Sequence, residues 1–230
     1  MIYRIIICLL LLALTACTPA RMAVDPALNV DSVKHKITEM PGVFSGDTIA
    51  FGPYKATKID RSWVKSTGGG GQIGNLKFGS SEQVQSYSYQ FNSKSSWDCD
   101  CEVSKQKSQF AIVSTDLSAD LNCYFSEMES GSDSASKWRF SFSGESPERA
   151  TGSIVVGSKT FTVKPVNKVA SSSFAMGNRT GYYFYSGEEL VAGVDAISKE
   201  GPVWLSNKLS QEEKDYISMV AVGLLLNQIH

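Results

Sequence analysis

The sequence predicts a mainly β protein: an antiparallel barrel or sandwich of roughly ten to twelve strands, with an apolar C-terminal helix enclosed by the sheet or packed on it. Two observations carry this prediction. Apolar and polar residues alternate with a period of two in many short runs between residues 46 and 194. Near the C-terminus the alternation stops, and an almost unbroken apolar segment follows a helix start signal.

Composition places the chain among ordinary globular proteins. Its 230 residues are 42% hydrophobic and 20% charged, which excludes a disordered polyelectrolyte. Its 22 basic and 23 acidic residues leave a net charge of -1. Such a balance offers no general attraction to the phosphates of nucleic acid, so we expect no nucleic-acid partner.

The first seventeen residues predict an export signal that ends in a lipidation site. A basic start at Met1–Arg4 precedes ten apolar residues at 5–14. As a helix this run is roughly 15 Å long, too short for a hydrocarbon core about 30 Å thick. It ends in Leu14-Thr15-Ala16-Cys17, which resembles the lipobox of bacterial lipoproteins. The resemblance implies diacylglycerol attachment to the thiol of Cys17, cleavage after residue 16, and acylation of the new amino terminus.

The lipobox resemblance also implies a cellular location. Residues 1–16 form the signal peptide, and several acyl chains, palmitate among them, anchor the mature protein stably. In proteobacterial lipoproteins, Asp after the lipidated Cys favours retention at the inner membrane, and here that position is Thr18. The resemblance therefore implies an outer-membrane protein that faces the periplasm, with the membrane as a partner through Cys17.

Residues 17–45 are interpreted as the lipidated N-terminus and a tether. The segment lacks a sustained apolar period and contains Pro19, Pro26 and Pro41. We expect at most one short helical turn, around residues 33–39. His35 lies in this charged segment, where solvation is favoured over a catalytic role. Residues 46–230 then form a single β-rich domain.

The strands are predicted from runs with one apolar and one polar face. In the clearest run, the apolar face carries Trp97, Cys99, Cys101 and Val103, and the polar face carries Asp98, Asp100 and Glu102. Similar runs lie at 87–91, 121–125, 137–142 and 161–163, and shorter ones at 109–113, 154–156, 182–185 and 190–194. Loop-forming residues separate them at 68–71, 130–133, 144–147 and 157–158. Without intervening helices, this spacing favours antiparallel pairing.

The C-terminal segment predicts a helix at residues 210–227. Ser210 and Glu213 fit a capping box, and residues 216–226 are apolar apart from Ser218 and Gly223. A helix that is apolar on all sides must be enclosed, and at roughly 16 Å this segment is too short to cross a membrane.

This order of elements resembles the tubby C-terminal domain and the phospholipid scramblases. The residues behind the comparison run from the aromatic strand Tyr182–Tyr185 to the terminal Leu224–Leu226. The resemblance implies a closed β-barrel around the apolar helix. A two-layer sandwich with the helix packed on one sheet stays open as the alternative.

Three cysteines remain after Cys8 is removed with the signal and Cys17 is acylated. In an oxidising compartment, Cys99 or Cys101 could bridge to Cys123 and stabilise the fold by roughly 3 kcal/mol. A strand at 109–115 in a simple meander would separate the two cysteine strands by about twice 4.8 Å, so the bridge would need another strand order or a contact across the core. We expect no zinc site, because no histidine lies nearby.

The other candidate sites also have structural explanations. The Asp98, Asp100 and Glu102 face could contribute to a Ca²⁺ site, but a soluble strand face is favoured. The glycines at 68–71 lack the Lys-Ser/Thr pair of a phosphate loop and indicate a mobile hairpin tip. The aromatic strand at 182–185 fits either a central strand with one face in the core and one under a loop, or a contact patch for a peptide, glycan or lipid.

Function is therefore predicted as that of a lipid-anchored, non-enzymatic periplasmic binding or interaction module. No G-x-S-x-G motif is present, and we expect no catalytic residue, metal or cofactor. The expected partner is an envelope protein, a glycan or a lipid. The two alternatives are a lipid or apolar-ligand binding protein and, less favoured, a cell-wall or glycan hydrolase.

Overall fold

The computed structural model describes residues 20–41, 46–74, 76–110, 113–128, 137–144, 149–170, 172 and 179–228. The signal peptide and Cys17 lie outside these residues. The strands are β1 Ser32–Glu39, β2 Ile49–Phe51, β3 Tyr54–Arg61, β4 Lys65–Ile73, β5 Leu76–Asn92, β6 Ser96–Phe110, β7 Val113–Glu127, β8 Lys137–Ser143, β9 Thr151–Val156, β10 Lys159–Val166, β11 Gly181–Ser186, β12 Glu189–Asp195 and β13 Pro202–Ser206. The helices are α2 Pro26–Asp31 and α3 Gln211–Gln228.

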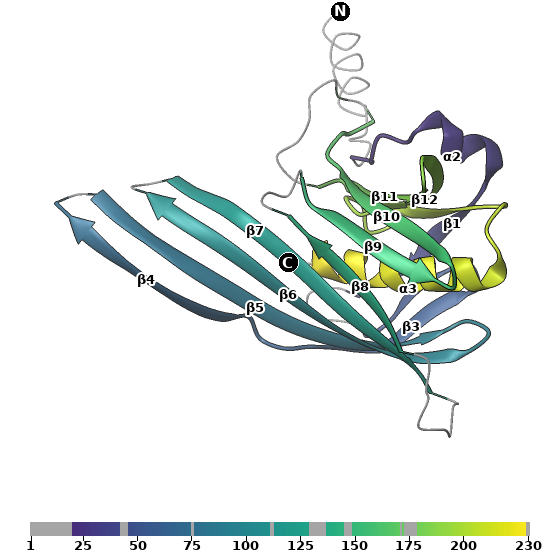
Figure 1. Ribbon diagram of the computed structural model, residues 1–230, viewed down its shortest axis with the longest axis horizontal. Coiled ribbons are helices and arrows are strands. Elements are labelled where there is room, and N and C mark those ends of the chain that lie inside the picture. The colour runs from purple at the N-terminus through teal and green to yellow at the C-terminus, as the bar shows by residue number, and fades with distance from the viewer. Residues whose placement is uncertain are drawn as a thin grey trace, which may run out of the picture.

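These strands form one antiparallel sheet that closes into a barrel. Their order is β3-β2-β1-β13-β12-β11-β10-β9-β8-β7-β6-β5-β4, and a further pairing of β3 with β5 closes twelve of them into a ring. The thirteenth strand, β4, pairs with β5 outside that ring (Figure 1). The mainly β prediction with a C-terminal helix is confirmed, and of the two architectures left open the barrel is observed.

The predicted alternation decides which side chains face the interior. Along β6, the side chains of Trp97, Cys99, Cys101 and Val103 are buried, and those of Asp98, Asp100 and Glu102 are exposed. Because successive side chains of a strand point to opposite faces, one face of this strand joins the core and the other meets solvent.

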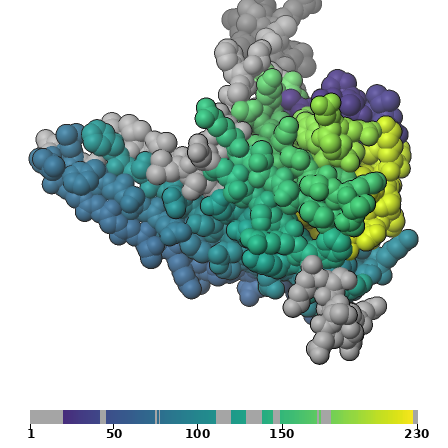
Figure 2. All heavy atoms as spheres, viewed as in Figure 1, coloured from purple at the N-terminus to yellow at the C-terminus, as the bar shows by residue number. Residues whose placement is uncertain are grey.

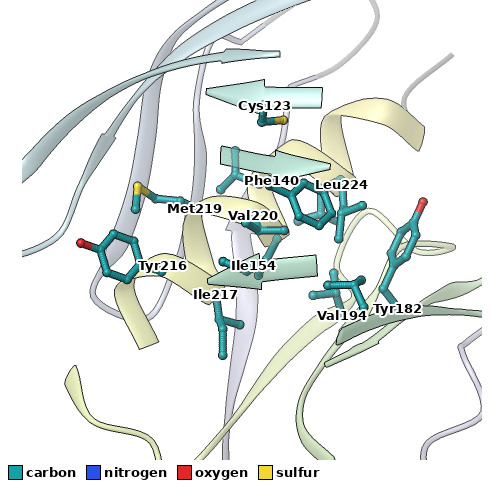
Figure 3. Close-up of a cluster of buried hydrophobic side chains, with 14 of the residues drawn as sticks. Cys123, Phe140, Ile154, Tyr182, Val194, Tyr216, Ile217, Met219, Val220 and Leu224 are labelled. Carbon is teal, nitrogen blue, oxygen red and sulfur yellow. The ribbon is translucent and has the colours of Figure 1, made fainter. Parts of the chain in front are cut away.

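Helix α3 runs through the interior and forms the centre of the core. Its segment from Tyr216 to Asn227 is buried on all sides. Figure 3 shows its apolar side chains beside residues of β8, β9, β11 and β12, namely Phe140, Ile154, Tyr182 and Val194. The predicted enclosure of an all-round apolar helix is thus observed.

Two buried tyrosines of β5 hold the helix in place. The hydroxyl of Tyr87 donates a hydrogen bond to the carbonyl of Gly223 (2.7 Å), and that of Tyr89 donates to the carbonyl of Met219 (2.7 Å). Burial raises the pKa of both hydroxyls well above the ordinary value, so they remain protonated donors. These bonds fix the position of α3 along its axis relative to β5.

The first turn of α3 is capped as predicted. The amide of Ser210 donates to the Glu213 carboxylate (2.7 Å), and the amide of Glu213 donates to the hydroxyl of Ser210 (3.2 Å). Burial alone would raise the pKa of Glu213, but the ion pair with Lys159 (2.7 Å) and the bonds from Ser210 outweigh it and hold the pKa below its ordinary value. The cap therefore carries a charge at neutral pH and ties the helix start to β10.

The N-terminal segment differs from the expected tether. The interpretation of residues 32–39 as part of a tether with a helical turn is wrong. These residues form β1, a strand of the barrel wall that pairs with β13 on one side and β2 on the other. The sequence shows no alternation of apolar and polar residues here, because Ile37 is the one residue of β1 whose side chain is fully buried. Backbone pairing, from Ser32 opposite Ser206 to Lys36 opposite Pro202, incorporates the strand instead. The folded domain therefore begins well before residue 46.

The residues before β1 pack against the outside of the barrel. Met22 and Leu28 are buried in a small cluster with Val166 and Trp204. The amide of Met22 donates to the carboxylate of Asp195, whose pKa is raised by burial against the opposing effect of such bonds. The chain is thus part of the folded body from about Met22 onward.

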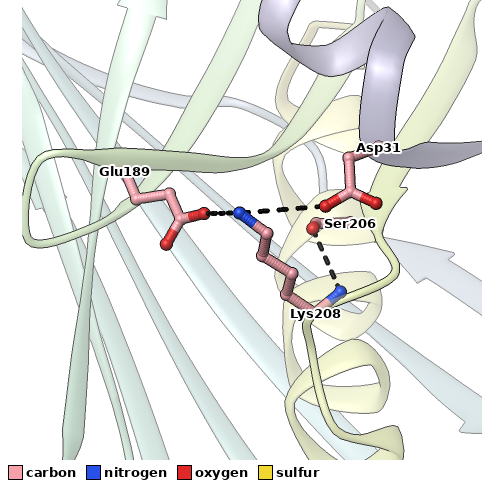
Figure 4. A network of polar contacts seen from close by, with 4 residues as sticks. All are labelled: Asp31, Glu189, Ser206 and Lys208. Carbon is pink, nitrogen blue, oxygen red and sulfur yellow. Dashed lines mark hydrogen bonds and ion pairs between the residues drawn. The ribbon is translucent and has the colours of Figure 1, made fainter.

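A polar network fixes the end of α2 to the sheet (Figure 4). The ammonium of Lys208 lies 2.6 Å from the Glu189 carboxylate and 3.8 Å from the Asp31 carboxylate. The backbone amide of Lys208 donates a hydrogen bond to the hydroxyl of Ser206. The three charged side chains are exposed, so their ion pairs contribute little energy. The network does connect α2, β12 and the turn before α3.

Candidate functional site

Four strands project from the barrel as a long arm (Figures 1 and 2). We define the arm as residues 65–73 of β4, 76–84 of β5, 104–110 of β6 and 113–120 of β7. It forms because β8 pairs only with residues 121–126 of β7, and β3 pairs only with residues 87–92 of β5. Beyond those points β4 to β7 pair only with one another.

The four glycines at 68–71 lie within β4 of the arm. The expectation of a loop or mobile hairpin tip at this position is wrong, since they pair in register with residues 78–81 of β5. A side chain at Gly70 would collide with the carbonyl oxygen of Phe78, and one at Gly79 would lie 3.0 Å from the carbonyl oxygen of Gly69. At Gly68 and Gly70 the neighbouring strand approaches so closely that only glycine fits, whereas a side chain at Gly69 would meet open space. The turn itself lies at Gly74, where φ is +59°.

A polar groove lies on the arm, with a volume of about 700 Å³. Its side chains come largely from the arm face that continues the inner face of the barrel, because Ser81 and Lys107 are opposite one another just as Tyr87 and Cys101 are. The lining combines hydroxyl, amide and ammonium groups with bare glycine backbone and one aromatic residue, Phe78, at its outer end. The lining residues are Ser66, Gln72, Phe78, Ser80, Ser81, Lys107, Ser108, Gln109 and the glycines at 68–71 and 79. This groove is the main candidate binding site.

The end of the arm is apolar. The exposed fractions there are 72% for Ile73, 49% for Leu76, 44% for Phe78 and 67% for Phe110. Phe78 of β5 lies directly opposite Phe110 of β6, so the two hairpins contribute to one surface. We call these four residues the apolar tip. Sequence reasoning missed it, although large apolar residues next to a Gly-Asn turn were a signal.

The acidic face of β6 borders a smaller depression of about 390 Å³. It is lined in part by Asp60, Asp100, Glu102 and the half-exposed Tyr124. The Asp98 carboxylate accepts a hydrogen bond from the Gln90 amide (3.1 Å). In the described part of the chain, no three His, Cys, Asp or Glu side chains come close enough to hold a metal ion. The favoured interpretation of a solvated strand face agrees with this geometry.

The structure joins Cys101 to Cys123, whose Cα atoms are 4.1 Å apart. The meander argument failed because residues 109–115 do not form a separate strand: β6 continues to Phe110 and β7 begins at Val113, so the two cysteines are directly opposite. Cys99 is a free, buried thiol. Burial raises the pKa of Cys99 far above its ordinary value, so it stays protonated and is not an activated nucleophile.

His35 lies in β1 and is packed rather than fully solvated. Its ring is 6.1 Å from that of Tyr54, and Gly52, with a φ of +54°, permits its close approach. Burial, followed by the charge of Lys214, lowers the pKa of the His35 imidazole, which favours its neutral form. The expectation of a solvated side chain is wrong in this respect. His230 lies outside the described residues.

The aromatic strand at 182–185 has both faces covered. Tyr182 and Phe184 are buried in the barrel. On the outer face, the hydroxyl of Tyr183 donates to the carbonyl of Ala23 (2.6 Å) and accepts from the amide of Asp25 (2.7 Å). The N-terminal segment therefore forms the predicted cover, and the structure favours this explanation over a contact patch.

No known family, characterised protein or solved structure matches this chain. The resemblance to tubby-like and scramblase-like barrels therefore stays a prediction, and the function has to be argued from the residues. Neither helix in the described ranges combines the length and apolar character needed to cross a bilayer.

Proposed function

We propose that this protein is a lipid-anchored, non-enzymatic envelope module that binds a hydrophilic envelope component in the groove of the arm. The observation that carries the proposal is the groove itself, about 700 Å³ on a structure that projects away from the body. A polar arm of this length has no role in enclosing α3, since it extends past the strands that close the barrel.

The chemistry of the groove favours a ligand rich in hydroxyl and amide groups. Serine hydroxyls and glutamine amides both donate and accept hydrogen bonds, and Lys107 adds donors. Glycan strands and extended polypeptides offer complementary groups. An apolar ligand inside the barrel is less well supported, because α3 occupies the centre of the core.

The start of the folded body supports a close attachment to the membrane. Arg21 is already held in place, since its carbonyl accepts from the amide of Ala170 (2.9 Å). It follows Cys17 by four residues, which span at most about 14 Å when extended. Lipidation at Cys17 would therefore hold the barrel directly against the membrane surface. The Cys101–Cys123 bridge is in keeping with an oxidising envelope compartment.

Photo-crosslinking in living cells tests the binding site. Ser66 is exposed and lines the groove, whereas Val155, at 51% exposure, lies on β9 of the barrel. Replacing each in turn with p-benzoylphenylalanine is expected to give an adduct with an envelope glycan or protein from position 66 and not from position 155. Adducts from both positions in equal amounts, or from neither although the protein is made and folded, would contradict the proposal.

A further inference from the structure

The exposed apolar side chains of the arm are concentrated at one end. Ile73 and Leu76 flank the turn between β4 and β5, and Phe78 and Phe110 are paired across β5 and β6. The ring of Phe78 lies against Gly71, where a Cβ atom would come within 2.7 Å of it. The absence of a side chain at Gly71 makes room for this ring, and the apolar tip forms a joint surface of two hairpins.

The apolar surface ends abruptly along the strands. On the face that carries Phe78 and Phe110, the next cross-strand pair is Ser80 opposite Ser108. Residues two apart in a strand are about 7 Å from one another, so the apolar surface is one pair and one turn deep. This depth suits the boundary between lipid headgroups and acyl chains, where peripheral apolar groups insert by about 5–10 Å. A protein-binding face on the arm would instead extend along its length.

The anchor places a bilayer near the tip. Cys17 is at most about 14 Å from the folded Arg21. In Figure 1, the beginning of the described chain beside α2 and the end of the arm both lie toward the upper side of the molecule. A membrane surface that holds the anchor on this side can therefore also meet the arm.

We propose that the apolar tip inserts into the interfacial region of the bilayer to which Cys17 is attached, an inference that rests on the proposed lipid anchoring. The anchor and the tip then form two separate membrane contacts, at opposite ends of the molecule. Two contacts fix its orientation, and the groove between them is held close to the membrane surface. Its ligand is consequently a component that reaches this surface.

Fluorescence of the lipidated full-length protein in vesicles tests the inference. The vesicles contain phosphatidylethanolamine and phosphatidylglycerol, with or without bromine on the acyl chains. Tryptophan is introduced at the tip (Ile73→Trp) or, as a control, at Met128 (Met128→Trp). Met128 directly follows β7 at the end of that strand remote from the tip, and it is 47% exposed. The signal of the four native tryptophans is subtracted by using the parent protein. We expect blue-shifted emission and strong quenching by brominated lipid for Ile73→Trp only.

A second variant guards against local changes caused by the added ring. Combining Ile73→Trp with Phe78→Ser and Phe110→Ser is expected to abolish most of the quenching while urea unfolding stays unchanged. If the tryptophan introduced at the tip is quenched by aqueous acrylamide and not by brominated lipid, the inference is overturned. Protection from both quenchers would indicate a protein contact, such as a second copy, and would overturn it as well. Failure to recover any lipidated protein would instead contradict the proposed function.

Discussion

Replacing Leu224 with alanine is expected to lower the free energy of unfolding by about 2–5 kcal/mol. Leu224 is completely buried in the C-terminal half of α3, beside side chains such as Phe140 and Tyr182 (Figure 3). Removing three carbon atoms there loses apolar burial and leaves a cavity between the helix and the surrounding strands, which are held by backbone pairing and collapse only partly. Urea unfolding followed by circular dichroism measures the change.

The matched control is Leu76→Ala at the apolar tip. The same atoms are removed, but Leu76 is 49% exposed and does not belong to the barrel core. We therefore expect the free energy of unfolding to change by no more than about 0.5 kcal/mol. Equal losses for the two variants would mean that α3 does not form the centre of the core. This would contradict the enclosed-helix architecture.

Breaking the bond between Cys101 and Cys123 is expected to lower the free energy of unfolding by roughly 3 kcal/mol. The bridge joins residues 22 apart, and closing this loop restricts the unfolded chain. Comparison of the oxidised protein with the protein kept in a reducing agent avoids the cavity that a substitution would create. The measurement is urea unfolding of both forms.

Cys99→Ala is the control for the third thiol. Because Cys99 is unbridged and buried, the difference between oxidised and reduced forms should persist in this variant. If the difference vanishes when Cys99 is removed, then Cys99 takes part in the bridge and the observed pairing is incorrect. A reduced form as stable as the oxidised one would contradict the stabilising role.

The barrel was predictable where side chains alternate and unpredictable where only the backbone holds a strand. The run from Trp97 to Val103 predicts a strand because one of its two faces is apolar. The segment at 216–226 predicts an enclosed helix because it is apolar on all sides. By contrast, β1 contributes only Ile37 as a fully buried side chain. Its place between β13 and β2 follows from long-range pairing, which no local pattern encodes.

The arm was missed for a related reason. Residues such as Gly68–Gly71 and Ser80–Ser81 bury no apolar face, so their local pattern is that of a loop. They form strands because each extends a hairpin already fixed in the barrel wall, as the register of β5 with β6 shows from Asn92 out to Phe78. The groove depends on this extension, and so does the pairing of Cys101 with Cys123.

We propose that Cys17 becomes the acylated first residue of the mature, envelope-attached protein. Mass spectrometry of the N-terminal peptide from protein purified out of membranes tests it most directly. We expect a peptide that begins at Cys17 and carries diacylglycerol and an amide-linked acyl chain. An intact peptide that runs from Leu14 through Arg21 with an unmodified cysteine would contradict it.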